Sequence, residues 1–251
     1  AFKIHYTPER DDFRHLTTFI LDSNAALAAA KICGVSLTVY LTSAMLLALQ
    51  RIQDEQTPDK RRQKPIRVVV PVNLRRLFPS RTLRNFVHVI MPEIDPRMGD
   101  YEFSEILTSV KHQLGLLVTK KNLCAMFTPN VNAERSPLLR VMPLFLKNIA
   151  MKLVYDTVGE RTNCLNLSNL GDIKVPDAMR RYVTRFEFIL GVQATKPNNC
   201  GVLSYNGKLY MNFIRNTVEP VLEFQFYQVL RELGLHVKVE SNGAGNVLIP
   251  N

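Results

Sequence analysis

Residues 32–50 carry no charged side chain, and this run limits the folds open to the chain more than any other feature. Its length approaches that of a membrane-spanning helix. It also contains Gly34 and Ser36, a pair typical of one helix ending and the next beginning. We therefore predict two helices, over residues 23–33 and 37–53, and we expect the second to be a buried core helix rather than a membrane span.

Amphipathic segments and short apolar runs alternate along the rest of the chain. Two strong helix patterns cover residues 101–118 and 219–233, and a further helical region covers 137–158 after an irregular stretch that contains Pro129. Pro71 and Pro92 are expected to mark an edge or a bulge. The predicted strands cover residues 16–21, 66–74, 86–94, 164–168, 185–192 and 235–240.

Asn206-Gly207 is the clearest turn signal, and β-prone residues 202–205 and 208–213 flank it. A hairpin pairs its strands antiparallel, whereas alternating strands and helices favour a parallel sheet. The sequence therefore predicts an α/β fold with a mixed β-sheet flanked by helices. We expect one structural unit across residues 1–251, because no linker rich in Gly, Pro and Ser interrupts the chain.

The composition is that of a folded, basic protein. Hydrophobic residues make up 46% of the 251 residues, which excludes global disorder, and the formal net charge is +10. A solvated surface, a nucleic-acid footprint and attraction for a polyphosphate ligand all explain such an excess. Residues 60–64 are basic without interleaved aromatic residues, which favours a solvated loop over nucleic-acid binding. Arg75 and Arg76, placed after a predicted strand, are better candidates for binding phosphate.

Few residues carry recognisable chemistry. The four cysteines lack the short spacing of metal ligands, so we expect free thiols, no metal site and a cytoplasmic location. The five histidines are isolated, and His88 is expected to point into the core from its strand. Ser168 and Asn169 stand at a strand end, where a hydroxyl could donate to a developing oxyanion. An ordinary turn that uses Asn and Gly explains the same residues.

Several stretches together resemble the C-terminal half of the CoA-dependent acyltransferase superfamily, which includes chloramphenicol acetyltransferase and condensation domains. The alcohol acetyltransferase-like branch is the most similar. The matching stretches, in chain order, are Gly34-Val35-Ser36-Leu37-Thr38, Val70-Pro71-Val72-Asn73-Leu74-Arg75, Asn85-Phe86-Val87-His88, Leu167-Ser168-Asn169-Leu170-Gly171 and Ser204-Tyr205-Asn206-Gly207-Lys208-Leu209.

The resemblance implies half of an enzyme. The family has two similar lobes, and its His-His-x-x-x-Asp-Gly motif lies in the N-terminal one. This sequence contains no two adjacent histidines, so we expect a single C-terminal lobe without its catalytic partner. The chain begins at Ala1 without Met, which also suggests a piece of something longer. We expect the chain alone to be inactive.

The resemblance also implies a reaction. A histidine of the first lobe takes a proton from an alcohol or amine, which attacks the thioester of acyl-CoA or an acyl-carrier protein. By the same resemblance Ser168 donates to the carbonyl oxygen, and Asn169 shapes the same site. Acyl-CoA is a co-substrate rather than a bound cofactor. Arg75 and Arg76 are candidate contacts for its phosphates.

Two further expectations concern partners. In the family a hairpin of the second lobe reaches across to the first. Here it would run from Val202 to Phe213, and without its partner it would expose strand edges and apolar side chains. We therefore expect the N-terminal lobe, self-association or refolding to cover it. The alternative to an enzyme lobe is a non-catalytic binding or scaffolding module for a carrier protein or another acidic partner.

Overall fold

The fold is described from a computed structural model, for residues 1–251 apart from 11–12, 138–140, 155–162, 194–195 and 244–251. The chain forms two compact units. Unit 1 comprises Ala1–Lys3 and Val39–Cys164, and unit 2 comprises Ile4–Thr38 and Leu165–Asn251. The expectation of one lobe across residues 1–251 stays a prediction.

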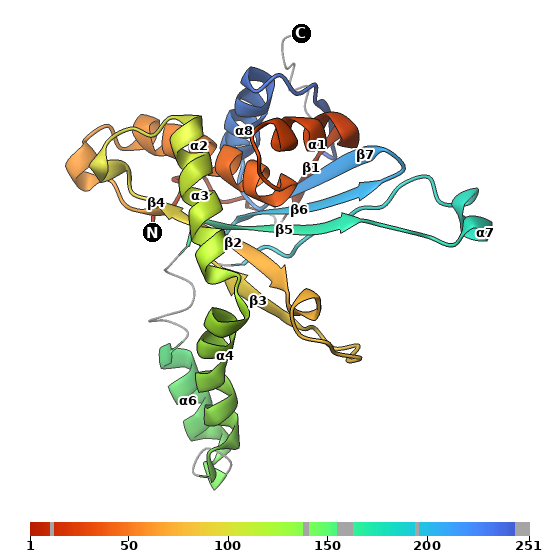
Figure 1. The fold of residues 1–251 in the computed structure, drawn as a ribbon. Coiled ribbons are helices and arrows are strands. Elements are labelled where there is room, and N and C mark those ends of the chain that lie inside the picture. Colours follow the sequence, from red (N-terminus) through yellow and green to blue (C-terminus); the bar gives the residue numbers. More distant parts are fainter. Residues whose placement is uncertain (11–12, 138–140, 155–162, 194–195, 244–251) are drawn as a thin grey trace. The chain divides into compact units, whose positions relative to one another are not determined.

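Unit 2 contains a mixed sheet. Within its described residues five strands follow the order β5-β6-β7-β1-β8. β5 and β6 are parallel, whereas the other neighbouring pairs are antiparallel, which confirms the predicted mixed sheet. The strands are β1 (His15–Asp22), β5 (Leu165–Asp172), β6 (Asn198–Tyr205), β7 (Lys208–Arg215) and β8 (Lys238–Ser241) (Figure 1).

Two helices of unit 2 match the sequence prediction, namely α1 (Ser23–Ile32) and α8 (Val221–Glu232). A short helix, α7 (Asp177–Arg180), was not predicted. The Phe226 ring of α8 lies 6.3 Å from the ring of Phe19 and 5.5 Å from that of Phe213, centroid to centroid, and all three are buried. These rings join α8 to β1 and β7, and they form the core on this face of the sheet.

β6 and β7 form the predicted hairpin, with Asn206 and Gly207 at φ angles of 50° and 75°. The expectation that the segment from Val202 to Phe213 exposes strand edges is wrong. β6 pairs with β5 and β7, and β7 pairs with β6 and β1. Apolar side chains on both of its faces are buried as well, among them Leu203, Tyr205, Leu209 and Met211. Strands distant in sequence cover both outer edges, so this hairpin offers no free edge for self-association.

Unit 1 contains three described strands, β2 (Ile66–Asn73), β3 (Val87–Ile90) and β4 (Glu93–Ile94). β2 pairs antiparallel with both others. The single strand predicted over residues 86–94 is therefore divided, and Pro92 lies at the break. Proline has no N–H to donate to a ladder, which explains the interruption expected there.

The helices of unit 1 are α2 (Leu37–Gln56, from Val39 onward), α3 (Phe103–Leu117), α4 (Lys120–Arg135) and α6 (Leu144–Val154). α2 is the predicted buried helix. Its Tyr40 ring meets that of Phe103 at 5.4 Å, and Gln50 Nε2 donates to the carbonyl oxygen of Tyr101 at 3.1 Å. α6 covers part of the helical region predicted over 137–158, from which 138–140 and 155–158 lie outside the described residues.

Two other predictions are wrong. The stretch around Pro129 was expected to be irregular, yet it forms α4 with the proline inside the helix. Residues 185–192 were expected to form a strand, yet they make no strand pairing. In the part of the chain that is described, no single helix is long and apolar enough to cross a membrane, and α1 and α2 pass that test only as a bent pair.

Candidate functional site

Asn169 lies inside β5, where the pairing register with β6 shifts between Asn169 and Asp172. Its Oδ1 accepts a hydrogen bond from the N–H of Gly171 at 2.8 Å, and its Nδ2 donates to Oγ1 of Thr38 at 3.2 Å. Gly171 has a φ of 79°, which an L side chain rarely adopts. The prediction that the strand ends at Ser168 and Asn169 is wrong, because β5 runs on to Asp172. The Asn–Gly pair lies inside the strand, at a shift in its pairing register rather than at a turn.

Ser168 points to the opposite face from Asn169, because side chains alternate between the faces of a strand. It stands opposite Gly201 of β6, Gly201 opposite Asn212 of β7, and Asn212 opposite Thr18 of β1. Together these four residues form a row, which we call the polar row, across one face of the sheet. The Ser168 hydroxyl is half-buried and has no hydrogen-bond partner among the described residues.

Residues 185–191 cross over the polar row without joining the sheet. A Cβ placed on Gly201 would lie 1.9 Å from the carbonyl oxygen of Phe188, so the segment touches the sheet backbone there. The Phe186 ring meets the ring of Tyr205 edge-on at 4.9 Å, and Asn199 Nδ2 donates to the carbonyl oxygen of Gly191 at 2.7 Å. The segment packs onto the sheet face, which explains an alternating pattern without strand pairing.

Charged groups of this segment meet the polar row. Glu187 accepts a hydrogen bond from Nδ2 of Asn212 and pairs with Arg185. Arg185 also donates to Glu240 of β8 at 2.7 Å, and this hydrogen bond lowers the pKa of the Glu240 carboxyl. The Glu187 carboxylate is thus already engaged by two partners. The polar row supplies hydroxyl and amide groups, and it contains no imidazole that could take a proton.

Sequence reasoning named Ser168 and Asn169 but missed Glu187, Arg185 and Asn212. The structure places Ser168 and Asn169 on opposite faces of β5. Asn212 carried a signal, because it is a polar residue inside the apolar run of β7. Arg185 and Glu187 alternate with Phe186 and Phe188, and that alternation was interpreted as a strand.

The phosphate candidates lie in unit 1. The Arg75 guanidinium donates through Nη2 to the carbonyl oxygens of Thr82 and Arg84, at 2.9 and 2.5 Å. Arg75 therefore closes the loop that follows β2. The side chain of Arg76 lies outside the described residues. Neither observation tests a contact with CoA, which stays a prediction for both arginines.

His88 lies on β3 opposite Val72 and is half-buried. Its Nε2 is shielded from solvent and has no hydrogen-bond partner among the described residues. This position fits the predicted inward orientation. Elsewhere in the described chain, no three His, Cys, Asp or Glu side chains gather as metal ligands would.

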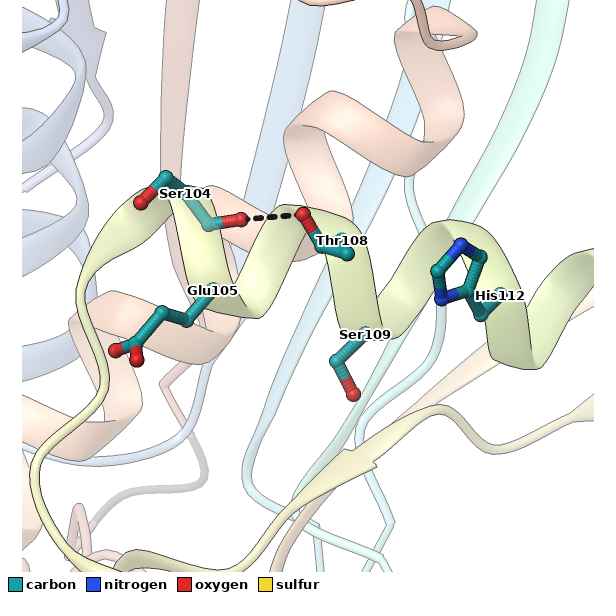
Figure 2. A pocket seen from close by; sticks show the side chains of 5 residues that line it. All are labelled: Ser104, Glu105, Thr108, Ser109 and His112. Carbon is teal, nitrogen blue, oxygen red and sulfur yellow. Dashed lines mark hydrogen bonds between the residues drawn. The ribbon is translucent and has the colours of Figure 1, made fainter.

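A shallow hollow of about 450 Å³ lies along one helix rather than at the polar row. Figure 2 shows its five lining side chains on α3: Ser104, Glu105, Thr108, Ser109 and His112. Its polar groups serve the helix itself. Thr108 donates to the carbonyl oxygen of Ser104, and Glu105 accepts from the N–H of Glu102 in a capping box. The hollow therefore gives no site comparable to the polar row.

Solved structures share this arrangement of strands and helices. An epimerization domain from the third module of tyrocidine synthetase B matches 93% of this chain with a TM-score of 0.56 at 11% identity. The TRI3 trichothecene 15-O-acetyltransferase from Fusarium sporotrichioides matches 92% with a TM-score of 0.52 at 12% identity. The chain has the condensation-domain-like acyltransferase fold.

A nonribosomal peptide synthetase, FmoA3, matches this fold over 92% of the chain with a TM-score of 0.57 at 14% identity. The chain covers 51% of the epimerization domain, 48% of the acetyltransferase and 23% of the synthetase. It therefore spans about half the length, or less, of these proteins. No family model and no curated protein matches the sequence.

Proposed function

We propose that this chain is the C-terminal part of an acyltransferase that moves an acyl group from a thioester to an alcohol or amine. The fold supports the reaction class, and the unpartnered hydroxyl of Ser168 supports a role for this unit in it. The proposed acyl donor is acyl-CoA or an acyl-carrier thioester, and the proposed location is the cytoplasm.

In the proposed reaction the base is an imidazole of the N-terminal lobe, which takes the proton of the acceptor. The acceptor attacks the thioester carbonyl, and negative charge develops on its oxygen. The C–S bond then breaks, and the leaving thiolate takes the proton that the imidazole had accepted. Ser168 donates a hydrogen bond to that oxygen, which costs little reorganisation because the hydroxyl has no competing partner among the described residues. Asn169 supports this role from the opposite face through its hydrogen bonds at the register shift of β5.

The test compares Ser168→Ala with Ser204→Ala in the protein that includes the N-terminal lobe, using an acyl-CoA and a panel of alcohols. Ser204 is the control because it is also half-buried and lies on the adjacent strand. We expect Ser168→Ala to lower kcat about 10²- to 10³-fold with little change in KM, and Ser204→Ala to keep full activity. An unchanged rate for Ser168→Ala would remove this residue from the mechanism.

The net charge of +10 favours a second candidate, a binding or scaffolding module for a carrier protein or another acidic partner. Calorimetry separates the two candidates. A scaffold binds an acidic carrier protein and not CoA, whereas the enzyme part binds acyl-CoA. We also expect the isolated chain to show no turnover, and robust turnover without a second lobe would contradict that expectation.

A further inference from the structure

α6 is an apolar helix whose described side chains are not buried. Leu144, Phe145, Leu146 and Ile149 are all exposed, Phe145 at 65% and Ile149 at 59%. A helix of 11 residues is marginal in water unless an apolar face packs against something. α6 therefore needs a surface to cover these side chains.

α4 precedes α6 in the chain and is anchored within unit 1. Leu123 is fully buried, and the Phe127 ring meets that of Phe78 at 5.7 Å. Other α4 side chains, Met126 and Val131, are exposed. We call α4 and α6 together the helical arm; both follow α3 in unit 1 (green in Figure 1). One of its helices is held by packing, and the other presents apolar side chains to solvent.

The charge of the helical arm identifies the surface that suits it. Its two helices contain five Lys or Arg and one Glu, a net charge of +4. α6 itself carries Lys147 and Lys152 and no acidic residue. Apolar side chains beside basic ones, without acidic residues, are complementary to a surface with a negatively charged outer layer and an apolar interior.

We propose that the helical arm binds an anionic membrane surface, with α6 lying in the plane of the lipid headgroups. Phe145, Leu146 and Ile149 fall within an arc of about 100° on a helix of 3.6 residues per turn. An apolar face of this kind enters the headgroup boundary while lysines contact anionic lipid. The helix is too short to span a bilayer, so binding is peripheral.

Charge separates this surface from other partners. A second copy of the chain would bring two arms of like charge together, which opposes pairing. A nucleic acid would match the charge but would leave Phe145 and Ile149 uncovered. An anionic lipid surface satisfies both the charge and the apolar side chains. The proposal does not depend on the acyltransferase assignment.

The first test uses the absence of tryptophan from the chain. Phe145→Trp places one fluorophore on α6, and Leu83→Trp places one at a residue that is fully exposed in unit 1 outside the arm. We expect Phe145→Trp emission to shift to the blue with vesicles of equimolar phosphatidylcholine and phosphatidylserine, and Leu83→Trp emission to stay unchanged. No shift for Phe145→Trp, or equal shifts for both variants, overturns the proposal.

The second test separates electrostatic binding to anionic lipid from nonspecific hydrophobic adsorption. Lys147→Glu with Lys152→Glu should weaken sedimentation with the anionic vesicles at least about tenfold, since each basic residue near such a surface contributes roughly fivefold. The control, Lys174→Glu with Lys208→Glu, makes the same charge change at exposed positions of unit 2 and should bind as the unchanged protein does. Equal binding to pure phosphatidylcholine, or a blue shift that follows protein concentration without lipid, overturns the assignment.

Discussion

Gly201 is the residue at which the segment over the polar row comes closest to the sheet. Any Cβ there would collide with the carbonyl oxygen of Phe188 at 1.9 Å, and a backbone atom cannot rotate away. We expect Gly201→Ala to lower the free energy of unfolding by about 2 kcal/mol or more. Gly191→Ala is the control, since nothing lies within 4 Å of a Cβ placed there. This substitution should change the free energy of unfolding by less than about 0.5 kcal/mol. Urea titration measures both, and equal effects would contradict the close contact.

The cysteines differ in what they can react with. Burial raises the pKa of Cys164 to about 11, and it raises the pKa of Cys200 well above the usual range, whereas Cys33 is exposed. Since the thiolate is the reactive form, a disulfide reagent at neutral pH should modify Cys33 rapidly and the two buried thiols only after unfolding. Counting modified thiols in native and denatured protein checks this. Cys164→Ser is the control. If the native unchanged protein rapidly labels one thiol more than native Cys164→Ser does, Cys164 is accessible and its burial is contradicted.

The raised pKa of Cys164 also predicts a dependence on pH. An unfolded thiol ionises near pH 9, whereas the folded thiol stays protonated up to about pH 11. Ionisation therefore favours the unfolded chain, and stability falls as the pH rises from about 9 towards 11. A shift of two units corresponds to roughly 2–3 kcal/mol. Cys164→Ala should remove this part of the loss, which thermal melts across that pH range would show.

The sequence predicted Ser168 and Asn169 as site residues but not the residues that contact them. Alternation along a strand predicts that Ser168 and Asn169 lie on opposite faces. It does not predict which residues contact them on each face. Thr38 and Gly201 reach Asn169 and Ser168 from distant parts of the chain. Such contacts depend on strand order, which local patterns do not contain.

At the scale of elements, α8 offers a matched pair of aromatic residues. Phe226 is buried against Phe19 and Phe213, whereas Phe224 lies on the same helix and is 45% exposed. We expect Phe226→Ala to cost about 3–5 kcal/mol of unfolding free energy. Phe224→Ala should cost less than about 0.5 kcal/mol. Similar losses in denaturant titration would contradict the packing of α8 on the sheet.

Elements with a strong pattern of their own were predictable, and the others were not. The stripe of α3 and the Asn-Gly hairpin depend on residues close in sequence. Residues 185–192 alternate between polar and apolar side chains, as a strand does. They do so because the segment packs on a sheet face, which buries the side chains on one side of the segment. α4 was missed because proline disfavours a helix interior, yet Pro129 is exposed and the helix continues through it.

For the whole molecule, the fold was predictable from ordered short motifs more than from any single one. The stretches around Gly34, Asn73 and Gly207 lie at turns or at ends of helices and strands, where backbone geometry restricts the choice of residue. The stretch around Ser168 lies inside β5, beside a shift in its pairing register. Burial of the hairpin was not predictable, because its covering strands come from residues 15–22 and 165–172.

The place of β1 has a consequence for how this polypeptide reaches its native state. β1 precedes the main segment of unit 1 in the chain, whereas its described partners β7 and β8 follow that segment. Its aromatic and branched side chains therefore stay exposed to solvent while the intervening residues of unit 1 are made and can already collapse. Chaperones should therefore bind nascent chains mainly through the segment of β1, and chains stalled before residue 208 should aggregate most readily.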